Sequence, residues 1–123
     1  MVIVDGNNVM GSRPDGWWRD RPGAVRRLVG QLGSLDRELI VVFDGPRPDG
    51  LQAPAGVDVR FARRRGRDAA DDDIVELVAA DPTPYRLLVV TSDAELARRV
   101  RELGAEVAGA RWLLDRVRPS SRP

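Results

Sequence analysis

Three short, apolar segments constrain the fold of this chain more than any other feature. They are VIV (2–4), LIVVF (39–43) and the LLVV within RLLVVT (86–91). Strands that are apolar on both sides are typical of parallel sheets with helices on both faces. A fourth strand is expected in the alternating VDVRFA (57–62), and a short fifth in AEVAG (105–109). The sequence therefore predicts a three-layer α/β/α domain around a five-stranded parallel sheet.

Amphipathic helices are expected between these strands, because apolar residues recur there at helical spacing. Their expected ranges are 22–33, 71–80, 92–104 and 111–117. In the helix at 92–104, Ser92 is the expected N-cap, and Glu95 is expected to reach back to it in a capping box. The 123 residues fit a single domain over 1–118, followed by a flexible tail at 119–123.

No segment of the sequence predicts a membrane span or a signal peptide. The apolar runs are too short to cross a bilayer. The N-terminal MVIVDG begins directly on a strand-like run, without the basic region that a signal peptide carries. We therefore expect a cytoplasmic protein with no membrane partner.

The composition excludes several kinds of chemistry. The chain has no Cys and no His, and all 20 of its basic residues are Arg. Disulfides, thiolate zinc sites, a histidine general base, a P-loop lysine and a Schiff-base lysine are therefore excluded. Any chemistry must come from carboxylates, hydroxyls, amides and arginines.

Acidic residues follow the strands at the points where each is expected to end. They are Asp5, Asp44 and Asp93 after the three apolar strands, and Asp68, Asp71 and Asp72 after the fourth strand and its arginine-rich loop. In an open parallel sheet the carboxyl ends of the strands share one edge, where ligands bind. Each acid alone also suits an ordinary turn or a helix cap. Their recurrence at one edge favours a shared acidic cleft.

An acidic cleft without His or Cys indicates a hard divalent cation such as Mg²⁺. Such an ion would offset the repulsion among the three consecutive aspartates at 71–73, and would position a water for attack on a phosphate. The preceding arginines, which pair well with phosphate, are candidates for gripping a polyanion. They also suit a solvated loop. They are Arg63, Arg64, Arg65 and Arg67.

Four motifs, VDGNNV, VVFDG, AADDDI and VTSD, resemble in order and spacing those of the NYN-domain family of PIN-like nucleases, in its YacP-like branch. The resemblance covers roughly residues 1–108 and implies a sheet of order 3-2-1-4-5. It also implies that Asn8 orients the substrate or a water, and that Mg²⁺ or Mn²⁺ is the cofactor. The metal ligands or supporting acids that it implies are Asp5, Asp44, Asp71, Asp72 and Asp93. Several relatives carry Glu where this chain has Ala69, which leaves the number of metals open.

The tryptophans suggest a contact with nucleic acid. Trp17 and the neighbouring Arg19 are candidates for stacking single-stranded bases beside a phosphate cleft. The alternative is that one of Trp17 and Trp18 packs inward while the other points outward. Trp112 is expected in the core.

Three functions are compatible with these patterns. The first is a Mg/Mn-dependent endoribonuclease acting on single-stranded or structured RNA, with Asp5, Asp72 and Asp93 as the principal ligands. RNA as the substrate rests on the resemblance, and a structure-specific DNA nuclease stays open. The second is a nuclease-like module that binds RNA or a protein without cleavage, which Ala69 favours. The third is a phosphatase, which the absence of Lys and the Asn at position 7 disfavour. A protein partner or a homodimer is compatible with each.

Overall fold

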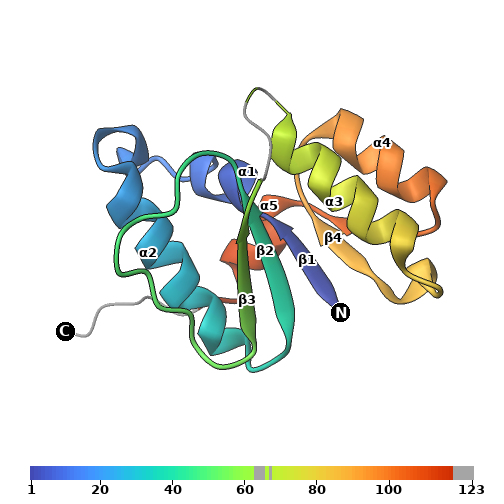
Figure 1. Ribbon diagram of the computed structural model, residues 1–123, viewed down its shortest axis with the longest axis horizontal. Helices are drawn as coiled ribbons and strands as arrows, with labels where there is room; N and C mark the ends of the chain where they lie inside the picture. The colour runs from blue at the N-terminus through green and yellow to red at the C-terminus, as the bar shows by residue number, and fades with distance from the viewer. Residues whose placement is uncertain (63–65, 67, 118–123) are drawn as a thin grey trace.

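The protein is described by a computed structural model that covers residues 1–62, 66 and 68–117 (Figure 1). Its five strands are all parallel and lie in the order β3-β2-β1-β4-β5. The strands are β1 (Val2–Asp5), β2 (Leu39–Phe43), β3 (Val57–Phe61), β4 (Leu88–Val90) and β5 (Glu106–Ala108). This confirms the predicted three-layer α/β fold and the sheet order that the family resemblance implies.

Helices cover both faces of this sheet. Helices α3 and α4 lie on one face, and α1, α2 and α5 lie on the other (Figure 1). The helices are α1 (Gly6–Gly11), α2 (Arg21–Leu32), α3 (Ala69–Ala80), α4 (Ala94–Glu102) and α5 (Ala110–Leu114), with 3₁₀ turns η1 (Trp17–Arg19), η2 (Gly33–Leu35) and η3 (Pro84–Arg86). None of the helices in the described residues is long and apolar enough to span a membrane.

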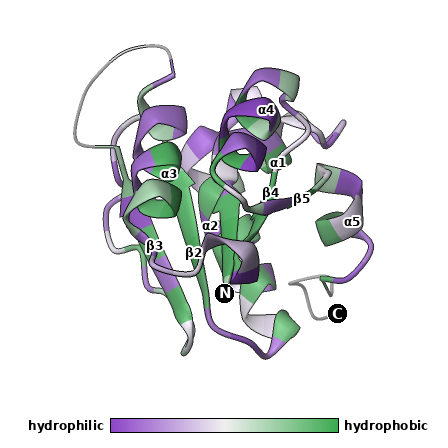
Figure 2. Ribbon diagram, turned by 90° about the vertical axis from the view of Figure 1, so that its right-hand side faces the viewer, coloured by the Kyte–Doolittle hydropathy of each residue, from purple (hydrophilic) through white to green (hydrophobic). Residues whose placement is uncertain are grey.

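Alternation along the strands divides the apolar residues between two cores. Val2 and Val4 of β1 pack with α1, α2 and α5, whereas Ile3 packs with α3 and α4. In β4, Val90 and Val89 divide between the cores in the same way. Successive side chains of a strand point to opposite faces, so a strand buried on both faces must be apolar at every position. In Figure 2 the central strands are mostly apolar, and the helices on either side carry both polar and apolar residues.

The short helix α1 is absent from our sequence-based expectations, in which Asp5 was a cleft acid or, as the alternative, part of an ordinary turn. In the structure Asp5 ends β1 and is the N-cap of α1. Gly6 is buried against the ring of Phe43, and a Cβ at position 6 would lie 2.6 Å from that ring. Only glycine permits this approach, so the helix can begin directly at the end of the strand.

The expected capping box of α4 is wrong. The N-cap is Asp93, whose carboxylate accepts hydrogen bonds from the backbone N–H groups of Glu95 and Leu96. The hydroxyl oxygen of Ser92 instead accepts a hydrogen bond from the N–H of Ala110, and Glu95 pairs with Arg98. A partner distant in sequence therefore takes Ser92 away from the capping box, and a neighbour on the same helix takes Glu95.

Candidate active site

Four carboxylates lie at the carboxyl edge of the sheet, and we call this group the acidic cleft. Asp5 ends β1, Asp44 follows β2, and Asp93 links β4 to α4. Asp71 lies in the first turn of α3. Because all the strands are parallel, these positions share one edge, where α1, α3 and α4 begin (Figure 1).

Asp5 is the most buried of these acids, with 4% of its surface exposed. Its carboxylate accepts hydrogen bonds from the Thr91 hydroxyl at 2.8 Å and from the Asn8 N–H at 3.4 Å. Burial raises the pKa of Asp5, the two hydrogen bonds lower it, and the charges of Asp93 and Asp44 raise it further. Thr91 also accepts a hydrogen bond from the N–H of Asp93, so a single hydroxyl connects two of the acids.

Asp71 shows most directly that the acids converge. Its pKa is raised to about 7, first by burial and then by the negative charges of Asp5, Asp93, Asp68 and Asp44. Among the described residues its carboxylate has no ion-pair or hydrogen-bond partner. Acids that are distant in sequence therefore act on one partly desolvated carboxylate, and no arginine of the described ranges is paired with it.

Asp44 joins three helices at the end of β2. Its carboxylate accepts a hydrogen bond from the N–H of Ala70, at 2.8 Å, in the first turn of α3. Its own N–H donates to the side-chain oxygen of Asn7 in α1, at 2.6 Å, and its carbonyl oxygen accepts from Arg21 at the start of α2. Through Ala70, this residue determines where the neighbouring Asp71 stands.

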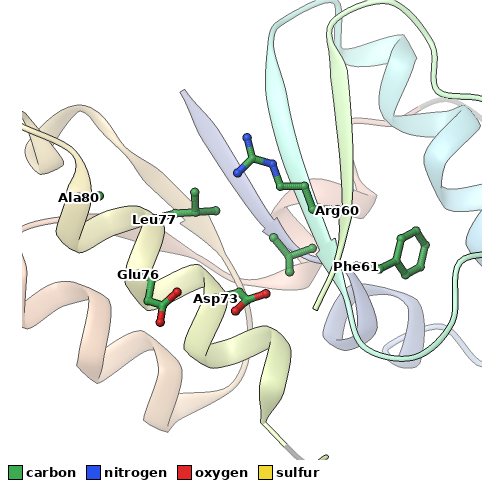
Figure 3. A pocket seen from close by; sticks show the side chains of 7 residues that line it. Arg60, Phe61, Asp73, Glu76, Leu77 and Ala80 are labelled. Atoms are coloured by element: carbon green, nitrogen blue, oxygen red, sulfur yellow. The ribbon is translucent and has the colours of Figure 1, made fainter. Parts of the chain in front are cut away.

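The three consecutive aspartates of α3 point in different directions, because successive residues of a helix are turned by about 100°. Asp71 faces the acidic cleft, and Asp72 forms an ion pair with Arg99 of α4 at 3.1 Å. Asp73 lines a groove of about 540 Å³ between β3 and α3, together with Arg60 and Leu77 (Figure 3). Because the three carboxylates point in different directions, the repulsion between them is reduced.

We named Asp72 with Asp5 and Asp93 as the principal ligands, and Asp71 as a further candidate. Helix α3 begins at Ala69 and not at 71, and in the structure the charges of Asp5 and Asp93 act on Asp71, whereas Asp72 pairs with Arg99 of α4. The metal-binding roles of Asp71 and Asp72 stay predictions. The groove of Figure 3 contains none of the cleft acids and lies apart from the candidate chemistry.

Asn8 is a connector at the edge of the acidic cleft. Its side-chain oxygen accepts a hydrogen bond from the N–H of Ser92 at 2.8 Å, which ties α1 to the end of β4. The expected role of Asn8 in orienting substrate or water stays a prediction.

The two adjacent tryptophans differ in exposure, as one of our alternatives anticipated. Trp17 packs partly buried against the core, and its expected contact with nucleic acid stays a prediction. Trp18 is 61% exposed, and the Arg19 guanidinium lies 5.6 Å from the centre of its ring. Trp112 is partly buried against the same core as Trp17.

The other expected nucleic-acid contacts lie outside the described residues, as does the expected tail at 119–123. These contacts are Arg63, Arg64, Arg65 and Arg67.

Several residues that shape the cleft were not identified from the sequence. Thr91 is 2% exposed, and its hydroxyl donates to Asp5. Its position in the VTSD motif, between the end of a strand and a helix cap, is the sequence signal that could have identified it. Asn7 and Arg99 act through partners 37 and 27 residues away, and no local pattern indicates such contacts.

The donor chemistry of the cleft suits a hard divalent cation, because its ligands would be carboxylate oxygens. Within residues 1–62, 66 and 68–117, no three acidic side chains are already gathered closely enough to form a metal site. Mg²⁺ commonly keeps several waters and binds one or two carboxylates directly, so the cleft fits the ion in charge and ligand type.

The strand order and the acidic carboxyl edge are those of the PIN-like nuclease fold. The family model of the YacP-like NYN domain matches residues 2–123, and the chain belongs to that family.

The chain is also similar to solved structures. The crystal structure of Rae1 (YacP) from Bacillus subtilis is 26% identical, with a TM-score of 0.76, over 94% of this chain and 71% of that one. The W164L mutant of the same protein matches at 24% identity and a TM-score of 0.73, over 93% of this chain and 72% of that one. A search of the curated proteins finds no match.

Proposed function

We propose that this chain is a metal-dependent endoribonuclease whose acidic cleft holds Mg²⁺ or Mn²⁺. The observation that carries the proposal is Asp71, a carboxylate that faces the charges of Asp5, Asp44 and Asp93 and forms no ion pair with any residue in the described ranges. Natural proteins retain such an arrangement at functional sites more often than elsewhere. Membership of the YacP-like NYN family supports the nuclease reaction, and RNA as the substrate rests on that family likeness.

Asp5, Asp71 and Asp93 are the proposed ligands. When bound, a divalent cation supplies activation of water and neutralises charge on the phosphate. The Thr91 hydroxyl donates a hydrogen bond to the Asp5 carboxylate at 2.8 Å and accepts one from the backbone N–H of Asp93. These two bonds fix the position of Asp5 relative to Asp93. Asp44 contributes as a positioning residue, because its carboxylate is occupied by the N–H of Ala70.

Trp18 and Arg19 are the proposed base-stacking contact. An exposed indole with an adjacent guanidinium suits unpaired bases, whose faces are free to stack. This favours single-stranded segments of RNA over continuous duplex.

Incubation of labelled single-stranded RNA with Mn²⁺ or Mg²⁺ tests the proposal. We expect cleavage that a chelator abolishes and that Asp5→Asn and Asp93→Asn both remove, while circular dichroism shows both variants folded. Cleavage that persists in the chelator or in both folded variants would contradict the proposal.

The second candidate is a nuclease-like module that binds RNA without cleaving it. The observation in its favour is Ala69, a buried residue at the start of α3, where several relatives carry Glu. Asp68, whose charge acts on Asp71, is the nearest acid in the sequence. Tight RNA binding by the wild type without cleavage in either metal would support this candidate against the first.

A further inference from the structure

A cavity of about 290 Å³ lies between α1 and α5, and its lining includes Ser12, Arg13, Ser92 and Arg111. We propose that this cavity is a subsite for an internal phosphodiester of the RNA strand, next to the scissile one. The inference rests on the proposed nuclease function and adds to it the place where the neighbouring phosphate is held.

Charge is the first argument for a phosphate. Neither Arg13 nor Arg111 forms an ion pair or a side-chain hydrogen bond with another described residue. The nearby Asp15 acts on Arg13 electrostatically, but it is paired with Arg27 at 3.3 Å. Burial lowers the pKa of Arg13, which shows that its charge has lost part of its hydration. A partly desolvated guanidinium is stabilised by an anion that accepts its hydrogen bonds.

The Ser92 hydroxyl is the second argument. Its oxygen accepts a hydrogen bond from the N–H of Ala110 at 2.9 Å, and it donates to no described residue. A hydroxyl that is already used as an acceptor keeps one O–H to donate. Two guanidinium groups and this O–H are all donors, so the cavity suits an acceptor-only ligand such as a phosphodiester.

The position of the cavity is the third argument. Ser92 lies between Thr91, which donates to Asp5, and Asp93, while its backbone N–H binds the side chain of Asn8. Helix α1 therefore carries Asn8 beside the acidic cleft and Ser12 beside the cavity, and four residues of helix span about 6 Å. A strand whose scissile phosphate is in the cleft would place an adjacent phosphate in the cavity.

The opposite charges of the two places would orient the substrate. The cleft carries carboxylates that lack an ion-pair partner among the described residues, and it would take a cation before a phosphate approaches. The cavity carries guanidinium groups that likewise lack a described ion-pair partner, so it would attract phosphate without a metal. Binding measured in a chelator therefore reports on the cavity separately from catalysis.

The experiment measures binding of fluorescent single-stranded RNA oligonucleotides in EDTA. The test variant is Arg13→Ala/Arg111→Ala. The control is Arg37→Ala/Arg86→Ala, which removes the same charge from exposed positions before β2 and β4, at the opposite edge of the sheet.

We expect the test variant to bind at least about 10-fold more weakly than wild type, as is typical of lost charge-assisted hydrogen bonds. Its slope of log Kd against log salt should decrease by about 0.7, the value for one lost phosphate contact on a single strand. The control should lose less than about 3-fold, since its charges act only at long range. Equal losses in the two variants would overturn the proposal.

A series of oligonucleotides with one neutral methylphosphonate each provides a test that does not depend on how a variant folds. One position should weaken binding to the wild type and have no further effect on the test variant or on Arg111→Glu, whose position is exposed. A uniform effect of all positions would overturn the proposal, and so would an effect confined to a 5′-terminal phosphate. Absence of cleavage by the wild type in Mn²⁺ would contradict the nuclease function alone, because these measurements contain no metal.

Discussion

Two acid-rich regions of the molecule satisfy their charges in opposite ways. On the exposed surface of α4, Arg98 forms ion pairs with Glu95 and, at 2.6 Å, with Glu102, and the hydrogen bond from Arg98 lowers the pKa of Glu95. In the acidic cleft, the donors that bind Asp5 and Asp93 from the described part of the chain are all neutral.

The difference shows which charges serve the fold and which are left for a ligand. Opposite charges three or four residues apart on a helix neutralise each other within the chain. The cleft acids come from separate strands and helices and converge on Asp71, whose pKa rises to about 7. No ion pair within residues 1–62, 66 and 68–117 offsets the repulsion on Asp71, which a bound cation would relieve.

The largest effect should come from comparing two adjacent aspartates, Asp71→Asn and Asp72→Asn. Asp71 faces the cleft, so we expect its variant to lose more than about 100-fold in cleavage, beyond the loss typical of residues that only support a metal ligand. Asp72 is paired with Arg99, so its variant should stay within a few-fold of wild type. Initial rates on labelled RNA in Mn²⁺ measure both, and equal losses would contradict the separation of their roles.

The next effect concerns Asp44, whose carboxylate holds the start of α3. Asp44→Ala removes the acceptor for the Ala70 N–H, and we expect a loss of about 10- to 100-fold in cleavage, the range for residues that position a ligand. Asp44→Asn keeps an oxygen acceptor and should retain most of the activity. If the Asn variant is as inactive as the Ala variant, Asp44 acts through its charge as a direct ligand.

The pH dependence of stability tests the charge of the cleft without catalysis. The folded-state pKa of Asp71, about 7, lies above its ordinary value of 3.8, so between these values the folded state holds a proton that the unfolded state releases. Stability from this group is therefore present below pH 4 and is lost as pH rises to about 7. In EDTA, the Tm of wild type should fall more between pH 5 and 8 than that of Asp71→Asn. A parallel fall in the two proteins would show that Asp71 is not perturbed.

The smallest effect is expected on α4, where the charges are paired and exposed. Glu95→Gln and Arg98→Ala should leave cleavage unchanged and Tm within error of wild type, because exposed ion pairs contribute little. A loss of cleavage in either variant would show that the α4 surface takes part in substrate binding, and that the contrast between the regions is incomplete.

Much of the fold was predictable, because a strand residue whose side chain is buried is apolar in the sequence. Val2, Ile3 and Val4 are all apolar because the two faces of β1 contact different cores. The acids at the strand ends followed from the same reasoning, since parallel strands bring their carboxyl ends to one edge. Helix α1 was not predictable, because its sequence reads as a turn and its start depends on Gly6 packing against Phe43.

The sequence by itself determined which residues are apolar, where the strands end and that acids follow them. Only the tertiary structure decided the direction of each carboxylate: Asp71 toward the other acids, Asp72 toward Arg99, and Asp44 onto the N–H of Ala70. The physical reason is that local alternation is set by backbone geometry, whereas the direction of a polar side chain depends on partners 26 or more residues away.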